Sequence, residues 1–194
     1  MQPKWWQPGV VYETVKTFLV VVGLALLIRT FLIQPFIVDG SSMVPTYHNS
    51  DYLLIDKLTY RFREPKRGEV IVFQYPRNPQ ENYIKRIIGL PGDTVEIKGD
   101  TVTIKNDANP NGVTLTEDYI NLGSTTAPFA TDMSTTLGAG QYFVMGDNRH
   151  ASSDSRFFGP LDEQYLIGRP LLRLYPFNDI RVLAGAPDRL ATDR

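Results

Sequence analysis

Residues 83–104 read YIKRIIGLPGDTVEIKGDTVTI, and this stretch indicates a mostly β protein. Its short runs of β-branched and apolar residues are separated by turn signals. In Leu90–Asp93 a glycine follows a proline, which is typical of a tight turn, and Lys98–Asp100 has the glycine of a hairpin turn. We therefore expect three successive strands here, the last two of them joined as a hairpin.

Similar runs occur on both sides of this stretch, and convincing helical periodicity is absent beyond Pro35. We expect a β domain over 36–184, followed by a tail over 185–194. Residues 106–140, rich in Asn, Thr, Ser, Gly and Ala, are predicted to be an irregular insertion or a smaller second lobe. The predicted strands are Tyr52–Ile55, Glu69–Phe73, Tyr83–Leu90, Thr94–Ile97, Thr101–Ile104, Gln141–Met145 and Leu171–Leu174.

The N-terminal part is strongly apolar, with FLVVVGLALLI at 18–28. A helix over Val15–Ile33 would be ~28 Å long, close to the ~30 Å of a bilayer core. A cleavable signal peptide is disfavoured because no small-x-small site follows, and a soluble core helix would need a polar face. We predict one transmembrane anchor over 15–35 after a tail over 1–14.

Composition excludes several kinds of chemistry. The chain has no cysteine, so disulfides, thiolate metal sites and cysteine nucleophiles are ruled out. Its net charge of −1 offers no bulk attraction for nucleic acid. We see no cluster of metal ligands and expect no cofactor. Only two histidines, His48 and His150, are present to act as the usual base of a hydrolase.

Adjacent serines in VDGSSMVPT, residues 38–46, are either part of a polar turn or include a nucleophile. One candidate base is His150, which lies among Asp and Ser residues and could belong to a Ser–His–Asp triad or to a solvated loop. The other is Lys85, since the neighbouring Arg86 cannot deprotonate. A lysine base needs a pKa ~2–3 units below its ordinary value, which burial can supply. Periodicity alone also allows Lys85 to lie at a sheet edge in water.

Four segments, in this order behind an apolar anchor, resemble type I signal peptidases, which are membrane-anchored proteases with a Ser–Lys dyad. The resemblance covers the chain from about Thr14 to Pro176. The segments are Phe36–Thr46 (FIVDGSSMVPT), Lys66–Phe73 (KRGEVIVF), Tyr83–Asp93 (YIKRIIGLPGD) and Gly146–Arg156 (GDNRHASSDSR).

This resemblance implies Ser42, directly before a methionine, as nucleophile and Lys85 as general base. Ser152 falls on a hydroxyl that orients the lysine amine in related enzymes. Gly40 replaces a serine whose hydroxyl serves the oxyanion hole in some relatives, so we expect a backbone amide or water there instead. The resemblance also implies supporting roles for Asp147, Asp154 and Arg156. The apolar residues that we expect to form shallow substrate-binding pockets, each of which could equally be core packing, are Phe36, Val38, Met43, Tyr83 and Ile84.

The implied function is removal of signal peptides from exported preproteins after small residues of the Ala-x-Ala type, through an acyl-enzyme. The implied partners are these signal peptides and the lipid bilayer, with the export machinery as a further candidate. The catalytic domain would lie on the extracytoplasmic side of the cell membrane. Alternatives are an organelle-type processing peptidase of the same family, a cytosolic self-cleaving repressor-type protease and a non-catalytic membrane-tethered β-domain adaptor.

Overall fold

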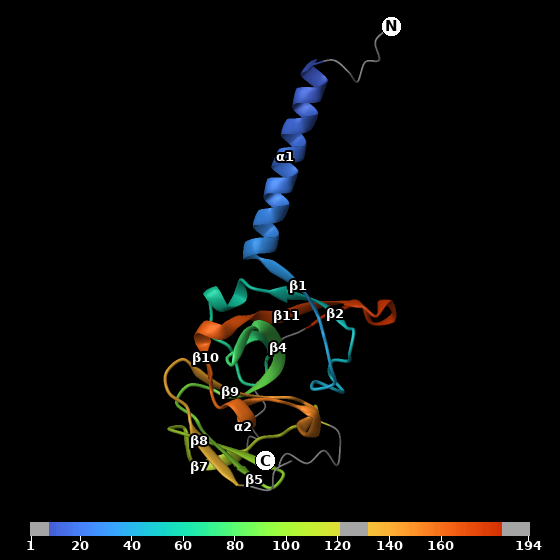
Figure 1. The fold of residues 1–194 in the computed structure, drawn as a ribbon. Helices are drawn as coiled ribbons and strands as arrows, with labels where there is room; N and C mark the ends of the chain where they lie inside the picture. Colours follow the sequence, from blue (N-terminus) through green and yellow to red (C-terminus); the bar gives the residue numbers. More distant parts are fainter. Residues whose placement is uncertain (1–7, 121–131, 184–194) are drawn as a thin grey trace.

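The computed structural model describes residues 8–120 and 132–183. One long helix, α1 (Pro8–Phe31), leads into a β domain made of two sheets (Figure 1). The prediction of a mostly β protein with an N-terminal apolar helix is confirmed. The helix begins and ends earlier than the predicted anchor.

The larger sheet is antiparallel and has the order β1-β2-β11-β3-β4-β9-β10, with β12 paired to β11. This order inserts β11, from the C-terminal part of the chain, between two early strands. The strands are β1 (Ile33–Ile37), β2 (Tyr52–Asp56), β3 (Val70–Tyr75), β4 (Asn78–Gly89), β9 (Gln141–Met145), β10 (Leu161–Asp162), β11 (Leu166–Tyr175) and β12 (Arg181–Val182).

The smaller sheet has the order β7-β6-β5-β8, and Lys98 pairs with Thr101 across the predicted hairpin turn. Its strands are β5 (Thr94–Lys98), β6 (Thr101–Asn106), β7 (Asn109–Thr114) and β8 (Met133–Thr136). Residues 106–140 are thus not wholly irregular, because β7 and β8 complete this sheet. Apolar patterning missed them since their polar residues are held by backbone pairing to β6 and β5. Residues 121–131 lie outside the described part.

Short helical turns connect the strands. They are η2 (Thr59–Arg61), η3 (Arg149–Ala151), α2 (Ser155–Phe158), η4 (Glu163–Tyr165) and η5 (Phe177–Asp179). The last residue before α2, Asp154, caps it by accepting a hydrogen bond from the backbone N–H of Arg156.

The second half of strand β4, residues 84–89, is buried on both faces, which the alternation of its residues could not establish. Ile84 lies in a core cluster with Leu53, Ile55 and Val72. Ile88 packs with residues of the smaller sheet, and Ile87 packs in a third cluster. Because core clusters pack against both faces of this part of β4, every side chain from residue 84 to residue 88 is buried.

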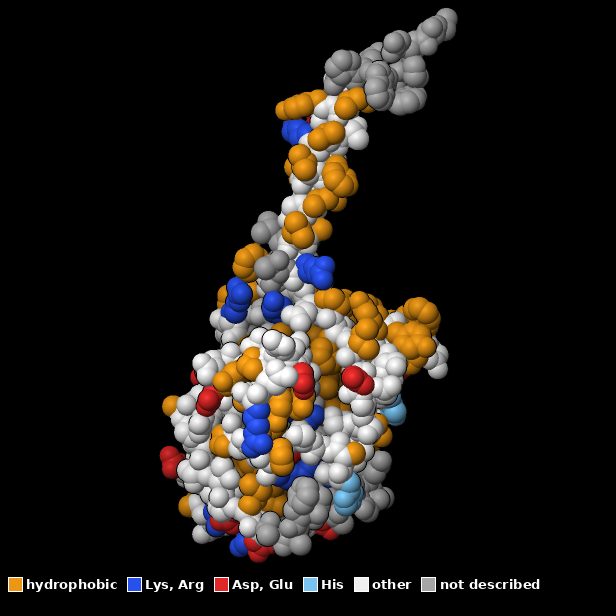
Figure 2. Space-filling view, viewed as in Figure 1, with side chains coloured by type: hydrophobic (Ala, Val, Ile, Leu, Met, Phe, Trp, Pro, Cys, Tyr) orange, Lys and Arg blue, Asp and Glu red, His pale blue; other side chains and the backbone are white. Residues whose placement is uncertain are grey.

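Helix α1 projects away from the β domain (Figure 1), and hydrophobic side chains occur along its length (Figure 2). The segment Gly9–Leu26 has a mean hydropathy of 1.7 and is not buried by the rest of the chain. Its length and composition are sufficient for crossing a bilayer. An uncovered apolar surface of this size is typical of a membrane or protein interaction site.

Candidate active site

Ser42 lies in the turn after β1, and two asparagines hold this turn. The backbone N–H of Gly40, whose φ is +92°, donates to Asn49 Oδ1 over 2.8 Å. From the other side, the Asn148 N–H donates to the Ser42 carbonyl over 3.0 Å, and Asn148 Nδ2 donates to the Ser41 carbonyl over 3.2 Å. Neither asparagine was predicted, because sequence spacing does not show which loops meet. Only glycine adopts the Gly40 conformation without strain, which explains its presence there.

Lys85 on β4 brings its amine to this turn. Its Nζ lies 2.7 Å from Ser42 Oγ and donates to the Ile84 carbonyl over 2.9 Å. The residue is only 4% exposed. Burial lowers the pKa of Lys85 to about 8, against the opposing attraction of Asp154 and Asp147. A substantial fraction of this amine is therefore neutral near pH 8.

Asp154 is a buried carboxylate whose negative charge acts on Lys85. It is fully buried, pairs with Arg156 through both oxygens, and accepts the Gly146 N–H over 3.0 Å. Ser152 Oγ donates to Asp154 Oδ2 over 2.7 Å. Among the described residues, Lys85 makes no hydrogen bond to Ser152. The Ser152 hydroxyl binds the Asp154 carboxylate instead, and the charge of that carboxylate acts on Lys85.

Asp147 forms a second buried ion pair with Arg86. The guanidinium donates to both carboxylate oxygens over 2.8 and 2.6 Å and also to the Gly68 carbonyl. Thr46 Oγ1 donates to the same carboxylate over 2.5 Å. The ring of Tyr119 lies 4.0 Å from the guanidinium carbon. These contacts give Arg86 a structural role beside Lys85. A guanidinium that is always charged cannot act as a base.

An open groove of about 440 Å³ runs past Ser42 and Lys85. Three of the predicted substrate-binding residues line this groove, namely Phe36, Tyr83 and Ile84. Gly40 lines it as well. Val38 and Met43 do not line it. They are 3% and 1% exposed and lie in the core beneath the turn. An apolar residue next to a turn satisfies either role on sequence alone, and only the packing separates them.

One side of the segment Tyr83–Lys85 is open. These residues pair with Phe73–Ile71 of β3, whereas pairing with β9 begins only at Arg86. Within the described residues, no strand pairs with the other side of this segment, which borders the groove. Unpaired backbone groups of this kind can accept an added strand.

His150 is exposed on η3. The position beside the Ser42 hydroxyl is occupied by Lys85, so the arrangement offers a lysine rather than an imidazole as proton acceptor. Among residues 8–120 and 132–183, no group of three or more His, Asp or Glu side chains is placed to hold a metal ion. A hydroxyl, a buried amine and an adjoining groove can support nucleophilic hydrolysis.

These features are compatible with a hydrolase, and comparison with known proteins identifies the family of the chain. The family model described as "Signal peptidase, peptidase S26" matches residues 11–175. A signal peptidase I of Bacillus licheniformis is 38% identical, covering 88% of this chain and 91% of the relative. A probable signal peptidase I-2 of Synechocystis is 37% identical over 93% of this chain and 81% of the relative.

A crystal structure of a signal peptidase I from Enterococcus faecalis is 36% identical in sequence, with a TM-score of 0.45. It covers 55% of this chain and 97% of that chain. On the family match and the curated relatives, the chain belongs to the signal peptidase I family. Together with this membership, the apolar α1 indicates association with a membrane.

Proposed function

We propose that this protein is a membrane-bound serine endopeptidase that removes N-terminal signal peptides from exported preproteins, with Ser42 as nucleophile and Lys85 as general base. The observation that carries the proposal is the 2.7 Å distance between Lys85 Nζ and Ser42 Oγ, together with the burial of the lysine. Family membership supports the substrate class.

In the proposed reaction, neutral Lys85 removes the Ser42 proton while Oγ attacks the scissile carbonyl. The protonated amine then donates its proton to the leaving amine as the peptide bond breaks, leaving an acyl-enzyme on Ser42. In the second half, Lys85 takes a proton from water, which attacks the ester and releases the signal peptide with a new carboxylate. The proton returns to Ser42 Oγ, so the enzyme is regenerated.

The Ser42 N–H is the oxyanion donor we assign. Among the described residues it has no hydrogen-bond acceptor, so it is available to a tetrahedral intermediate. The Gly40 N–H is not available, because Asn49 already accepts its hydrogen bond. One such donor contributes ~2.7–4 kcal/mol to the transition state.

We further propose that the substrate binds in extended form along the open side of Tyr83–Lys85. Backbone pairing would hold any sequence, while the groove walls formed by Phe36 and Ile84 would favour small side chains before the cleaved bond. Gly40 and Ser41 also line this groove. Cleavage after Ala-x-Ala fits this proposal.

In the proposed topology, α1 crosses the cell membrane once, with the β domain on the extracytoplasmic side, where exported preproteins emerge. The helix measures ~36 Å at ~1.5 Å per residue, which is sufficient for a ~30 Å bilayer core. Protease added outside spheroplasts should digest the β domain. Its protection unless the membrane is opened would contradict the orientation.

A cleavage assay tests the chemical proposal. A preprotein with an Ala-x-Ala site is incubated with detergent-solubilised wild type and with the Ser42→Ala, Lys85→Ala, Ser41→Ala and His150→Ala variants. The first two substitutions should reduce kcat/KM by about 10⁴-fold or more, and the other two should retain most activity. Activity that survives Lys85→Ala but is lost in His150→Ala would overturn the dyad.

A further inference from the structure

Residues 115–120 follow β7 and link the smaller sheet to the loop over residues 146–152. Leu115 is buried in the core of the smaller sheet. Beyond it the exposure of the side chains alternates: Glu117 and Tyr119 are partly buried, whereas the residue that precedes each of them is exposed. None of these six residues lines the catalytic groove. Any effect of this segment on cleavage must therefore pass through other residues.

Glu117 is the charge partner of Arg149, which is the largest by volume of the fully buried side chains in the described residues. The guanidinium donates to both carboxylate oxygens, through Nη1 over 3.0 Å and also through Nη2. Its Nε donates to the Gly146 carbonyl over 3.1 Å. The Glu117 side chain is only 7% exposed. Because an uncompensated buried charge is strongly unfavourable, the position of Arg149 depends on Glu117.

The backbone at Arg149 is bonded to both parts of the candidate active site. Asn148, the preceding residue, donates its N–H to the Ser42 carbonyl over 3.0 Å. The Arg149 carbonyl accepts a hydrogen bond from Arg156 Nη2 over 2.7 Å. Arg156 pairs with Asp154, the carboxylate whose charge acts on the dyad lysine. A displacement of Arg149 would therefore reach the nucleophile through one hydrogen bond and this carboxylate through another.

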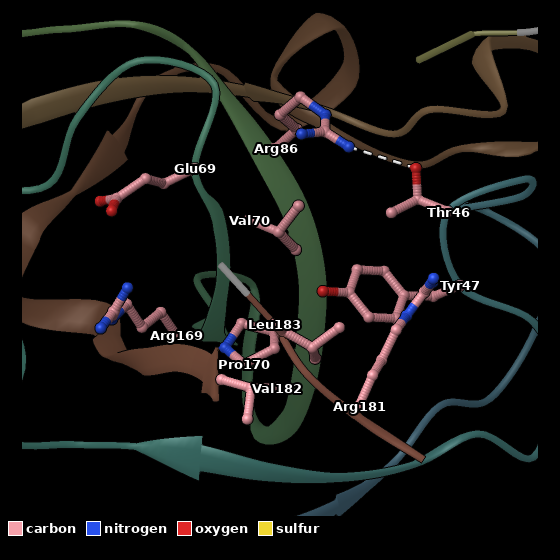
Figure 3. A pocket seen from close by; sticks show the side chains of 10 residues that line it. All are labelled: Thr46, Tyr47, Glu69, Val70, Arg86, Arg169, Pro170, Arg181, Val182 and Leu183. Atoms are coloured by element: carbon pink, nitrogen blue, oxygen red, sulfur yellow. Dashed lines mark hydrogen bonds between the residues drawn. The ribbon is translucent and has the colours of Figure 1, made fainter. Parts of the chain in front are cut away.

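Tyr119 fixes the orientation of the Glu117 carboxylate. Its hydroxyl donates to Glu117 Oε1 over 2.7 Å, and its ring packs against the core of the smaller sheet. The same ring lies 4.0 Å from the guanidinium carbon of Arg86. Arg86 donates to Thr46 Oγ1 over 3.2 Å (Figure 3). A second path therefore leads from this segment to the chain just after the Ser42 turn.

We propose that Glu117 is a positioning residue of the signal peptidase reaction and acts through Arg149. By holding the loop over residues 146–152, it fixes the orientation of Ser42 toward Lys85. This inference rests on the proposed function, since it concerns the same dyad. Because Glu117 does not line the groove, it acts on the chemical step and not on substrate binding. The chain between β7 and β8 thereby contributes to catalysis.

Glu117→Gln keeps the shape of the side chain and removes its charge. Asp118→Asn is the matched control, because it removes one charge from the exposed neighbouring residue. Cleavage of an Ala-x-Ala preprotein is measured in single turnover, with the full-length enzyme in detergent micelles and in excess. Glu117→Gln should lower the rate constant at saturation about 10²-fold, as a ~1 Å misplacement of a reacting group does, and Asp118→Asn should leave it unchanged. A loss of folded enzyme alone would instead raise the enzyme concentration at half saturation and leave the rate constant unchanged.

A double-mutant cycle tests the route through Arg149. If Glu117 acts only by holding this guanidinium, its substitution has no further effect once the guanidinium is gone. The double variant Glu117→Gln with Arg149→Gln should therefore be no slower than Arg149→Gln alone. Losses that multiply in the double variant would overturn the route.

Hydrogen exchange provides a readout that does not depend on cleavage. The Asn148 N–H bonds to the Ser42 carbonyl, and the Val38 N–H, which bonds to the Asp51 carbonyl, is the internal reference. In Glu117→Gln the ratio of the Asn148 exchange rate to the Val38 exchange rate should increase by about tenfold or more, because the loop opens locally. Global destabilisation would accelerate both amides together and leave the ratio unchanged.

Tyr119→Phe removes only the donor to Glu117 and keeps the ring, so it tests the same link where Glu117→Gln folds poorly. It should change the rate constant and the exchange ratio in the same directions, by smaller factors. An unchanged rate constant, an unchanged exchange ratio, or an equal loss in Asp118→Asn would each overturn the inference. Absence of cleavage by the wild type would instead contradict the proposed function, and the exchange ratio would still decide whether Glu117 holds the loop.

Discussion

The Lys85 amine meets the Ser42 hydroxyl at 2.7 Å across 43 positions of sequence, inside a site that leaves the lysine 4% exposed. Water is thereby largely excluded from the amine, and the charged form loses hydration that the protein only partly replaces. The same burial that makes the lysine a usable base makes its charged state costly. Both consequences can be measured.

The first prediction concerns the pH dependence of cleavage. Because the base must be neutral, kcat/KM should rise with pH through a single ionisation near 8 and level off above it. Initial rates at substrate concentrations well below KM, from pH 6 to pH 10, give the profile. A midpoint at the ordinary lysine value of 10.5 would show that burial does not tune this amine.

The second prediction concerns stability. Between pH 8 and 10.5 the unfolded lysine is protonated while the folded one is largely not, so the unfolded state binds more protons and stability increases with pH. The loss of stability caused by burying the charged lysine is fully present below about pH 8 and absent above about pH 10.5. It totals about 3 kcal/mol.

Lys85→Met isolates this contribution. The variant should be inactive yet more stable than wild type at pH 7, and the difference should shrink at pH 10.5 as the wild-type lysine becomes neutral in both states. Denaturant unfolding in micelles at both pH values provides the two free energies. A difference that does not change with pH would contradict the assignment.

A third prediction follows from the buried Arg86–Asp147 pair. Asp147→Ala leaves a buried guanidinium without its bidentate partner and should lower the free energy of unfolding by about 3–5 kcal/mol. Arg181→Ala, which breaks a half-exposed pair with Asp179 at 3.4 Å, should cost less than about 1 kcal/mol. Similar losses in both variants would mean that burial does not set the energy of the pair.

Gly146 provides a fourth prediction. A Cβ at this position would lie 2.5 Å from the Ser42 carbonyl oxygen and 2.6 Å from Ser152 Cβ, so Gly146→Ala must displace the nucleophile turn. We expect kcat/KM to fall by about 10²-fold, the effect of misplacing a reacting group by ~1 Å. Gly138→Ala is the matched control, since its Cβ would meet only the flexible end of Gln141 at 3.3 Å. Unchanged kinetics in Gly146→Ala would contradict this close packing.

The fifth prediction separates a direct role of Ser152 from one through Asp154. Ser152→Ala removes a donor to the Asp154 carboxylate, whose less satisfied charge should attract the protonated Lys85 more strongly and raise its pKa. The midpoint of the pH profile should move upward, and activity at pH 8 should fall about fivefold, as an upward shift of about one unit from a pKa of about 8 requires. Ser153→Ala, at the next residue along the chain, which lines the groove, is the control. Lower activity without a shifted midpoint would favour a direct contact with the amine.

Much of the fold followed from local sequence because strands and turns have local causes. The hairpin around Lys98–Asp100 and the tight turn at Leu90–Asp93 contain glycines that take positive φ, at 99 and 92. The strands β7 and β8 were missed, since their polar residues depend on pairing with β6 and β5 rather than on an apolar face. The long apolar run before Pro35 was sufficient to predict the helix α1.

By itself, the sequence determined the β class, the apolar helix and the chemical candidates, since these depend on residue type and short-range spacing. Tertiary structure decided the rest. It placed Lys85 beside Ser42, brought Asn148 to the Ser42 turn, and buried Val38 and Met43 while leaving Phe36 in the groove. The physical reason is that burial, and hence the pKa of Lys85, depends on which distant strands pack together, and no local pattern encodes that packing.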